Sequence, residues 1–344
     1  MSWLGDDDDE PEFDESDIRV RPNPKANRPR TKRRPAHADA QVARVLGVDR
    51  GRYTVLVDED GPDEHRVLAS RARELRKQAI VNGDRARIVG DISGAEGTLA
   101  RIVGIEPRTS LLRRSADDTD QVERIIVANA DQMLIVVAAA DPEPRPRLVD
   151  RYLIAALDAG IHPLLVVTKT DLADPADFLA NFEGLDDLEV LTSREDRMPV
   201  DEIGARLSGH ATVFVGHSGV GKSTLVNALV PSAERATGHV NEVTGRGRHT
   251  SSSAVSLRYE GEAGRGWVID TPGVRSFGLG HVNPANILKA FTDLALVAEA
   301  CPRGCTHRAD APDCAIAEAV ADGRLGERGP ARLDSLQRLL ETFH

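Results

Sequence analysis

One stretch decides the central fold of this chain: Gly216-His217-Ser218-Gly219-Val220-Gly221-Lys222-Ser223. It fits the pattern G-x-x-x-x-G-K-[ST], follows an apolar strand pattern at 211–215 and precedes a helical pattern at 225–229. Glycines let the backbone N–H groups of such a loop turn inward around a phosphate, and the following helix N-terminus adds positive potential. The Lys222 ammonium is expected to reach the β and γ oxygens of a nucleoside triphosphate, and the Ser223 hydroxyl to ligate Mg²⁺. The motif predicts nucleotide binding but does not identify the base.

A second motif indicates which base is bound. Thr168-Lys169-Thr170-Asp171 follows an apolar strand pattern and matches the guanine-reading pattern N/T-K-x-D. The Asp171 carboxylate can accept hydrogen bonds from N1–H and the exocyclic amine of guanine. Adenine would leave this carboxylate unpaired, which discriminates by about 10⁴-fold. Lys169 would pack its stem on the base, and Ser193, at the end of the next strand pattern, would supply the short loop over the guanine.

A third motif, Asp270-Thr271-Pro272-Gly273, matches the switch pattern D-x-x-G. Asp270 is expected to hold Mg²⁺ through water, and the N–H of Gly273 to contact the γ-phosphate. A hydroxyl from the loop at 245–253 would complete the Mg²⁺ shell in the GTP state, with Thr250 as the first choice and Ser251 as the alternative.

The residue after the switch motif is Val274, where Ras-like enzymes carry a glutamine that orients the attacking water. Valine has no polar group for this task, so another residue must position the water. His249 is the candidate, because its imidazole is mostly neutral at pH 7 and can accept a hydrogen bond from water. Arg246, Arg248 or a group on a binding partner are the alternatives.

The order of these motifs is itself informative. The usual order in GTPases is P-loop, switches, guanine motif, whereas here Thr168–Asp171 comes before Gly216–Ser223 and Asp270–Gly273 follows. Opening the chain at a different point preserves every strand contact, so the order predicts a circularly permuted α/β domain.

The flanking regions predict two further modules. The chain has 344 residues, which suggests two or three domains. Short strand patterns and Gly-containing turns between about 41 and 105 indicate a small barrel, OB-like in our interpretation, although an SH3-like barrel fits the same pattern. The pattern after Gly280 is mainly helical.

All three cysteines of the chain lie in this C-terminal part, in the arrangement Cys301-x₃-Cys305-x-His307-x₆-Cys314. Three thiolates and one imidazole are the ligand set of a closed, tetrahedral zinc site, and their clustering favours a metal over disulfides. Four protein ligands leave no open position, so we expect one structural Zn²⁺.

The N-terminal residues are expected to be disordered. Residues 1–18 are densely acidic, and residues 19–34 carry eight Lys or Arg and no acid, although the net charge of the chain is −11. The basic block either binds a polyanion or is a solvated tail. No apolar run approaches a membrane span, and the acidic run at 6–10 lies where a signal peptide would need positive charge, so we expect a cytoplasmic protein.

The ordered set of motifs resembles the bacterial RsgA/YjeQ family of circularly permuted small-ribosomal-subunit biogenesis GTPases. Further stretches carry the resemblance over roughly residues 40–340: Gly51–Val55, Asn82–Asp84, Ala128–Gln132, Asp150–Leu153, Gly245–Thr250 and Asp270–Phe277. The resemblance implies an N-terminal OB fold, a central permuted GTPase and a C-terminal zinc domain. It also implies binding to the 30S subunit and its 16S rRNA, assistance in late maturation, GTP hydrolysis stimulated by the 30S subunit, and a role for the loop histidine. Thr168, where the family usually has Asn, puts in doubt one hydrogen bond to the base or the P-loop.

The sequence therefore predicts a charged extension over 1–37, a barrel over 38–108, the GTPase over 109–280 and a zinc-binding helical domain over 281–344, in a monomer. Its expected catalytic residue is His249. Its expected nucleotide-binding residues are Thr168, Lys169, Asp171, Ser193, Gly216, His217, Ser218, Gly219, Val220, Gly221, Lys222, Ser223, Thr224, Thr250, Asp270 and Gly273. Its expected metal ligands are Ser223 and Thr250 for Mg²⁺, and Cys301, Cys305, His307 and Cys314 for Zn²⁺.

Overall fold

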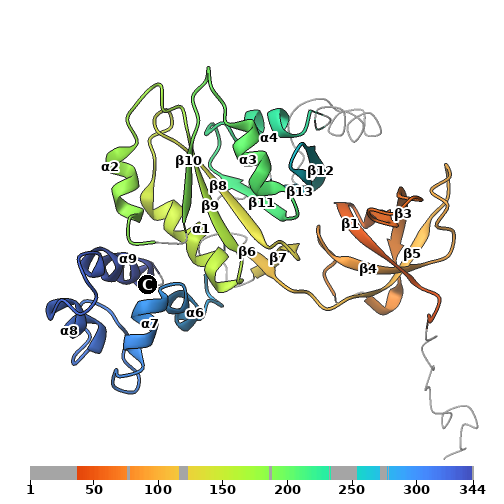
Figure 1. Cartoon of the computed structure of the whole chain (residues 1–344). Coiled ribbons are helices and arrows are strands. Elements are labelled where there is room, and N and C mark those ends of the chain that lie inside the picture. The colour runs from red at the N-terminus through yellow and green to blue at the C-terminus, as the bar shows by residue number, and fades with distance from the viewer. Residues whose placement is uncertain are drawn as a thin grey trace, which may run out of the picture. The chain divides into compact units, whose positions relative to one another are not determined.

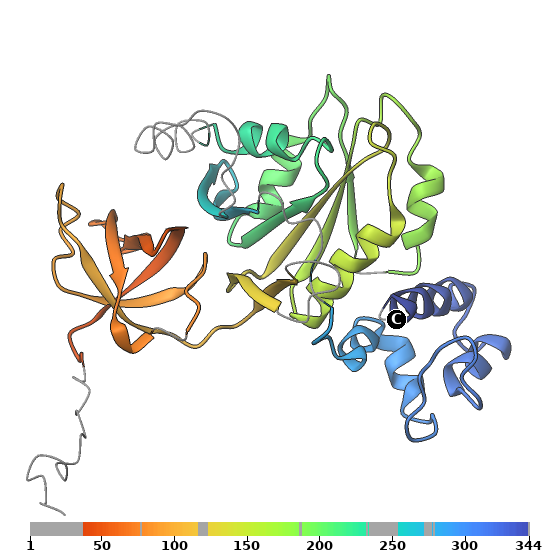
Figure 2. The same cartoon turned by 180° about the vertical axis from the view of Figure 1, so that it is seen from behind.

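The structure is a computed structural model that describes residues 37–75, 78–115, 123–185, 188–231, 233, 254–271, 277 and 279–342. Figures 1 and 2 show its helices and strands from two opposite sides. The charged extension expected to be disordered lies almost wholly outside these ranges, so its disorder stays a prediction.

The first module is a five-stranded barrel. Its strands are β1 (Gln41–Asp49), β2 (Arg52–Val57), β3 (His65–Arg71), β4 (Arg85–Val89) and β5 (Ala100–Ile105). The pairs β1–β2, β2–β3, β3–β5, β5–β4 and β4–β1 close a ring, and only β3 and β5 run parallel. Alternate side chains point inward, so Val55, Val67 and Ile102 are fully buried. The ring confirms the predicted barrel, and its strand order is that of an OB fold.

A two-stranded hairpin follows the barrel, formed by β6 (Leu111–Ser115) and β7 (Glu123–Ala128). The sequence patterns considered above did not predict it. The signal was present in the β-branched run Ile125-Ile126-Val127, of which Val127 is buried.

The central module is a six-stranded sheet with helices on both faces. The strands are β8 (Gln132–Ala138), β9 (His162–Thr168), β10 (Glu189–Thr192), β11 (Ala211–Gly216), β12 (Val255–Gly261) and β13 (Gly264–Asp270). Their spatial order is β10-β9-β8-β11-β13-β12, and the first five strands are parallel. β12 runs antiparallel to β13, so the sheet is mixed. The near-continuous apolar strand patterns that alternate with helical patterns in this part of the sequence had indicated a parallel sheet covered on both faces.

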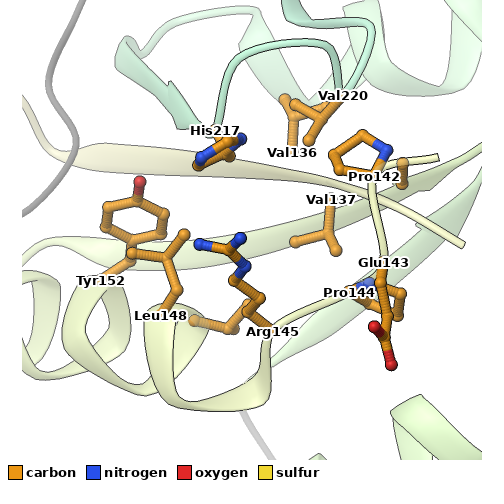
Figure 3. A pocket seen from close by; sticks show the side chains of 12 residues that line it. Val136, Val137, Pro142, Glu143, Pro144, Arg145, Leu148, Tyr152, His217 and Val220 are labelled. Atoms are coloured by element: carbon orange, nitrogen blue, oxygen red, sulfur yellow. The ribbon is translucent and has the colours of Figure 1, made fainter. Parts of the chain in front are cut away.

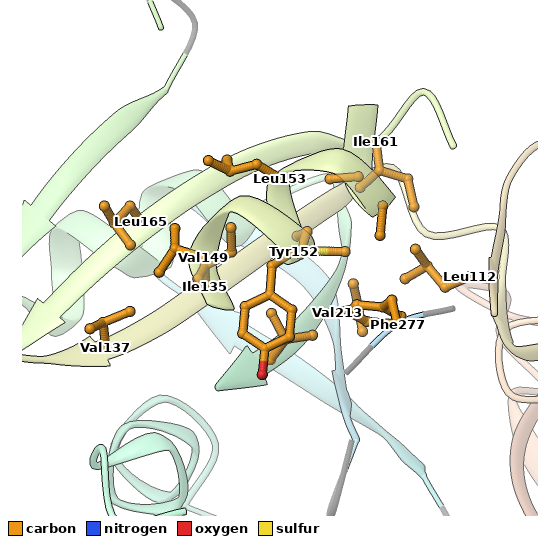
Figure 4. Close-up of a cluster of buried hydrophobic side chains, with 14 of the residues drawn as sticks. Leu112, Ile135, Val137, Val149, Tyr152, Leu153, Ile161, Leu165, Val213 and Phe277 are labelled. Atoms are coloured by element: carbon orange, nitrogen blue, oxygen red, sulfur yellow. The ribbon is translucent and has the colours of Figure 1, made fainter. Parts of the chain in front are cut away.

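The helices of this module are α1 (Pro146–Asp158), α2 (Ala176–Leu179), α3 (Val200–Leu207) and α4 (Lys222–Leu229). All seven residues of β8 are buried, and they alternate between two cores. Met133, Ile135 and Val137 face a cluster with α1, shown in Figure 4. The intervening residues Leu134 and Val136 face α3 and α4. Because helices cover both faces of the sheet at β8, side chains on both sides of this strand are apolar.

The C-terminal module is helical, as expected. It contains α6 (Pro284–Lys289), α7 (Thr292–Ala298), α8 (Ala315–Ala321) and α9 (Gly329–Glu341). Its core includes Phe291, Leu294, Ile316 and Leu336, all fully buried. None of the helices in the described ranges combines the length and the apolar character needed to span a bilayer.

Tyr152 on α1 gives a test of the central core. Its ring packs edge-on against Phe277, with centroids 5.7 Å apart, while its buried hydroxyl has no hydrogen-bond partner among the residues that the structure describes. Burial raises the pKa of this phenol to about 12. Because an unpaired buried hydroxyl is destabilising, we expect Tyr152→Phe to raise the free energy of unfolding by about 1 kcal/mol, measured by urea denaturation.

Tyr152→Ala is the control, because it also removes the ring and should cost about 3–5 kcal/mol. A Tyr152→Phe protein that is less stable than the wild type would mean that the hydroxyl does have a hydrogen-bond partner.

Candidate functional site

The phosphate loop has the backbone geometry that its glycines predict. A Cβ on Gly216, the last residue of β11, would lie 2.6 Å from the carbonyl oxygen of Val136, so only glycine fits this close approach. Gly221, the N-cap of α4, has a φ of +89°, in the left-handed region that favours glycine. The chain therefore turns sharply from β11 into α4, and the N-terminus of α4 points at the loop.

Lys222 and Asp270 meet at this loop from two different motifs. The Lys222 ammonium donates a hydrogen bond to Asp270 Oδ1, and the two side chains are 12% and 25% exposed. Thr271 anchors the strand that carries Asp270, because its hydroxyl donates to the Phe214 carbonyl at 2.8 Å. The cation expected to bind phosphate and the carboxylate expected to serve Mg²⁺ thus lie side by side. Ser223 and Thr224 are exposed on the first turn of α4.

The guanine motif is held against the same loop. Thr168, at the end of β9, donates its hydroxyl to the Val220 carbonyl at 2.6 Å. Asp171 Oδ1 accepts from the backbone N–H of Glu195 at 3.1 Å. Ser193 is buried, and its carbonyl oxygen accepts from the N–H of Thr170 at 3.2 Å. The structure therefore brings together the two strand ends that the sequence assigns to the base, and joins them to the P-loop.

One contributor was missed from the sequence, the loop after β8. The Lys169 ammonium donates a hydrogen bond to the carbonyl oxygen of Asp141 in this loop, which also contains the cis peptide bond Asp141–Pro142. Lys169 itself has a φ of +55°. The Asp-Pro dipeptide marks a turn, but the sequence does not reveal that the turn fixes the lysine of the guanine motif.

A small cavity of about 20 Å³ lies beside the P-loop, between β8 and the start of α1. Figure 3 shows Val137 and Leu148 in its wall, with Arg145 and His217 pointing into it. His217 also contacts the Ser218 carbonyl oxygen through Nδ1, at 2.9 Å. A space of this size holds about one water molecule and no nucleotide. Two of its lining residues, His217 and Val220, belong to the P-loop, so the cavity adjoins the candidate nucleotide site.

Several predicted residues fall outside the described part of the chain. These are His249 with its alternatives Arg246 and Arg248, Thr250 and Ser251, and Gly273 with Val274. The assignments of the water-positioning group, the second Mg²⁺ hydroxyl and the γ-phosphate N–H therefore remain predictions.

The predicted metal ligands come together in the C-terminal module. The ligand atoms of Cys301, Cys305, His307 and Cys314 all lie within 4.8 Å of one another. His307 Nδ1 is 3.7 Å from the sulfur of Cys301 and 3.8 Å from that of Cys314. Donors at the vertices of a tetrahedron around Zn²⁺, with Zn–S bonds of about 2.3 Å, lie about 3.8 Å apart. The spacing and the chemistry of the donor set thus fit zinc.

The electrostatic surroundings suit a neutral imidazole ligand. Burial lowers the pKa of His307, which favours the unprotonated ring. Burial raises the pKa of the Cys305 thiol, and the neighbouring cysteines raise it further. Three thiols this close would repel one another as thiolates, so a divalent cation is the natural counter-charge for them.

The chain is similar to known proteins along most of its length. Residues 105–280 match the family model described as RsgA GTPase. The "Small ribosomal subunit biogenesis GTPase RsgA 1" of Vibrio vulnificus is 38% identical over 273 residues, covering 77% of this chain and 75% of the relative. The RsgA of Pseudomonas aeruginosa is 39% identical over 276 residues, with coverage of 77% and 76%.

This chain belongs to the RsgA GTPase family. Solved structures agree on the fold. YjeQ from Thermotoga maritima has a TM-score of 0.63 at 25% identity, covering 88% of this chain and 98% of that one. YloQ, described as a circularly permuted GTPase, has a TM-score of 0.60 at 23% identity, with coverage of 90% and 98%.

Membership of the RsgA family makes the chain an enzyme that hydrolyses GTP, and such enzymes use Mg²⁺ with the nucleotide. The order of elements agrees with the permuted order of the motifs, with the guanine motif at the end of β9 and the P-loop at the end of β11, and the solved structure of YloQ has the same fold.

The metal cluster can be tested directly. Metal analysis of the purified wild type should find about one Zn²⁺ per chain. Cys305→Ser should abolish it, because zinc requires a thiolate at this position, and should lower the unfolding temperature of the C-terminal helices. Thr306→Val, between two of the ligands, is the control and should keep the metal. A folded wild type without zinc would overturn the assignment.

Base recognition can be tested at Asp171. In Asp171→Asn the side chain keeps an acceptor for the Glu195 N–H but gains an amide donor. Xanthine has a carbonyl where guanine has its amine, so GTP affinity should fall about a hundredfold or more and XTP affinity should rise.

The control is Asp174→Asn, which changes a carboxylate in the same loop that caps the Ala176 N–H at 3.0 Å. The affinities of both variants for GTP and XTP are measured by isothermal titration calorimetry. Unchanged GTP affinity in Asp171→Asn would remove this residue from the base pocket.

Proposed function

We propose that this chain binds the small ribosomal subunit through contacts that include 16S rRNA, hydrolyses GTP there, and assists late maturation of the subunit. The curated relatives are called small ribosomal subunit biogenesis GTPases, and the resemblance covers about three quarters of the chain. The observation that carries the proposal is the contact between the guanine motif and the P-loop, Thr168 to Val220, within a permuted sheet. We further propose that the protein acts as a monomer in the cytoplasm.

The geometry supports a division of tasks within the nucleotide site. Backbone N–H groups from Gly219 to Ser223 would surround the β-phosphate, and Lys222 would contact the β and γ oxygens. Asp171 would read guanine, Lys169 would pack against it, and Ser193 would close the pocket. The rest of the nucleotide's surroundings would come from the remaining P-loop residues Gly216, His217 and Ser218, and from Thr224 just after the loop.

Mg²⁺, when bound, neutralises charge that develops on the phosphate oxygens. The residues proposed to hold it are Ser223 and Thr250, with Asp270 acting through water. Zn²⁺ is proposed to be structural, because Cys301, Cys305, His307 and Cys314 would fill a tetrahedral shell. The proposed domain boundaries are 38–108, 109–280 and 281–344, after a charged extension over 1–37.

His249 is proposed as the catalytic group, which accepts a hydrogen bond from the attacking water and holds it in line with the γ-phosphate. Three points support this role: Val274 has no polar side chain, a neutral imidazole is a suitable acceptor, and the resemblance implies a loop histidine. The flanking Gly245 and Gly247 favour a loop that can change its conformation on partner binding.

His249→Ala tests this proposal. Free wild type should hydrolyse GTP slowly, and 30S subunits should raise kcat. The variant should bind GTP and 30S subunits normally but lose about a hundredfold or more of the stimulated kcat, because positioned proton acceptors contribute at that scale. His210→Ala is the matched control, since His210 is exposed and contacts Asp131 at 3.0 Å, outside the nucleotide site.

Three outcomes are informative. Stimulation of His249→Ala equal to that of His210→Ala would transfer the role to Arg246, Arg248 or a ribosomal group. A wild type that binds 30S subunits without stimulation would favour an RNA-binding scaffold in which the nucleotide is a slow timer. A wild type that does not bind them would refute the proposed partner.

A further inference from the structure

Thr168 stands at the position where the guanine motif of this family usually has asparagine. Thr168 is the last residue of β9, and it is only 7% exposed. Its hydroxyl donates to the Val220 carbonyl of the P-loop at 2.6 Å and lies 3.2 Å from a second carbonyl oxygen, that of Val137. A Cβ placed on Gly221 would lie 3.6 Å from the same hydroxyl. Thr168 is therefore packed against the P-loop, and the contact between the two motifs is retained despite the substitution.

The count of protons separates threonine from asparagine. An asparagine amide has two N–H protons and can serve two acceptors, whereas a hydroxyl has one. Both oxygens that face the Thr168 hydroxyl are carbonyl acceptors, so they compete for that single proton, and the shorter distance assigns it to Val220. No proton is left for a third acceptor.

Guanine presents such a third acceptor. When Asp171 pairs with N1–H and the exocyclic amine on the six-membered ring, N7 lies on the opposite, five-membered ring. N7 carries a lone pair and no proton, so it requires a donor. With guanine paired to Asp171 in this way, N7 would face the start of the motif, where the side chain of residue 168 contacts the P-loop.

The Thr168 proton is not free to move to the base at low cost. Among the described residues, no backbone N–H outside the helices and strands donates to the Val220 carbonyl oxygen, so the threonine hydroxyl is its donor within that part of the chain. Turning the hydroxyl toward N7 would leave this carbonyl unpaired in a buried place, and an unpaired buried acceptor is destabilising. The gain of one hydrogen bond would be offset by the loss of the other.

We infer that Thr168 is a specificity-determining residue that gives its one proton to the P-loop and leaves N7 of the guanine base unread. The inference rests on the proposed guanine pocket. Its consequence is that this enzyme tolerates guanine nucleotides altered at position 7. Selection of guanine over adenine is unaffected, because both purines have N7 and the discrimination comes from Asp171.

The test compares GDP with 7-deaza-GDP, in which N7 is replaced by C–H, by displacement of a fluorescent GDP analogue. The wild type should bind the two with affinities within about twofold of each other. Thr168→Asn adds a second donor and should prefer GDP over 7-deaza-GDP by about threefold to tenfold, the scale of one neutral hydrogen bond.

Two further variants separate base reading from loop support. Thr168→Ser keeps the hydroxyl and should resemble the wild type. Thr168→Val removes the donor to Val220 and should weaken both nucleotides by the same factor. A wild type that prefers GDP by threefold or more would overturn the inference, as would a folded Thr168→Asn protein with equal affinities. The ratio of the wild-type affinities for GDP and 7-deaza-GDP tests the inference even if Thr168→Asn does not fold.

Failure of the inference can be told from failure of the proposed site. If Asp171→Asn switches the preference from GDP to XDP while the wild type discriminates against 7-deaza-GDP, the base pocket stands and only the role of Thr168 falls. If Asp171→Asn leaves the preference unchanged, the pocket itself is misplaced, and the inference falls with it.

Discussion

Hydrogen bonding between parallel strands is the constraint on which the nucleotide site depends. β9 pairs with β8, β8 with β11, and β11 with β13, all in parallel. Their carboxyl ends therefore meet at one edge of the sheet. Three of these strands end at Thr168, Gly216 and Asp270. The sheet therefore brings together the guanine motif, the P-loop and the switch aspartate, although they are far apart in the sequence.

Circular permutation follows as a tolerable change. The ladder requires that each strand have its neighbours, but it does not require a particular order along the chain. The permuted order does change which segment ends the GTPase domain. The switch motif now comes last in this domain, and α6 and the cysteine cluster follow it along the chain. A protein with this order has a short covalent path from its switch motif to its cysteine cluster.

The sequence was sufficient for those parts of the protein in which a local pattern has one physical meaning. The P-loop, the order of motifs, the apolar strand β8 and the Cys₃His cluster are of this kind, and the structure has them where the patterns indicate. The hairpin of β6 and β7 was missed because its strands are short and only partly buried. The antiparallel β12 was misjudged because apolar periodicity does not encode strand direction. The contact of Lys169 with Asp141 depends on two segments 28 residues apart, and no local pattern predicts such a meeting.

Thr168 shows the same division between residue type and geometry. From sequence alone the substitution could remove a hydrogen bond either to the base or to the P-loop, and the two losses have different consequences. The hydrogen bond to the Val220 carbonyl rules out a loss at the P-loop, because the Thr168 side chain still joins the two loops. Because the hydroxyl has only one proton, the hydrogen bond to the base is the one that we infer to be missing. Residue type limited the alternatives, and geometry chose between them.

The ion pair of Lys222 with Asp270 has a consequence for how nucleotide and Mg²⁺ would bind at the proposed site. Both side chains are largely buried, so separating them without new partners would leave two poorly solvated charges, which is strongly unfavourable. Phosphate can replace the carboxylate at Lys222, but it then leaves Asp270 beside an approaching polyanion. A divalent cation resolves this conflict, since it attracts the carboxylate and the phosphate oxygens together. Nucleotide and Mg²⁺ are therefore expected to enter as a unit: each one removes the electrostatic penalty that the other alone would create at this ion pair.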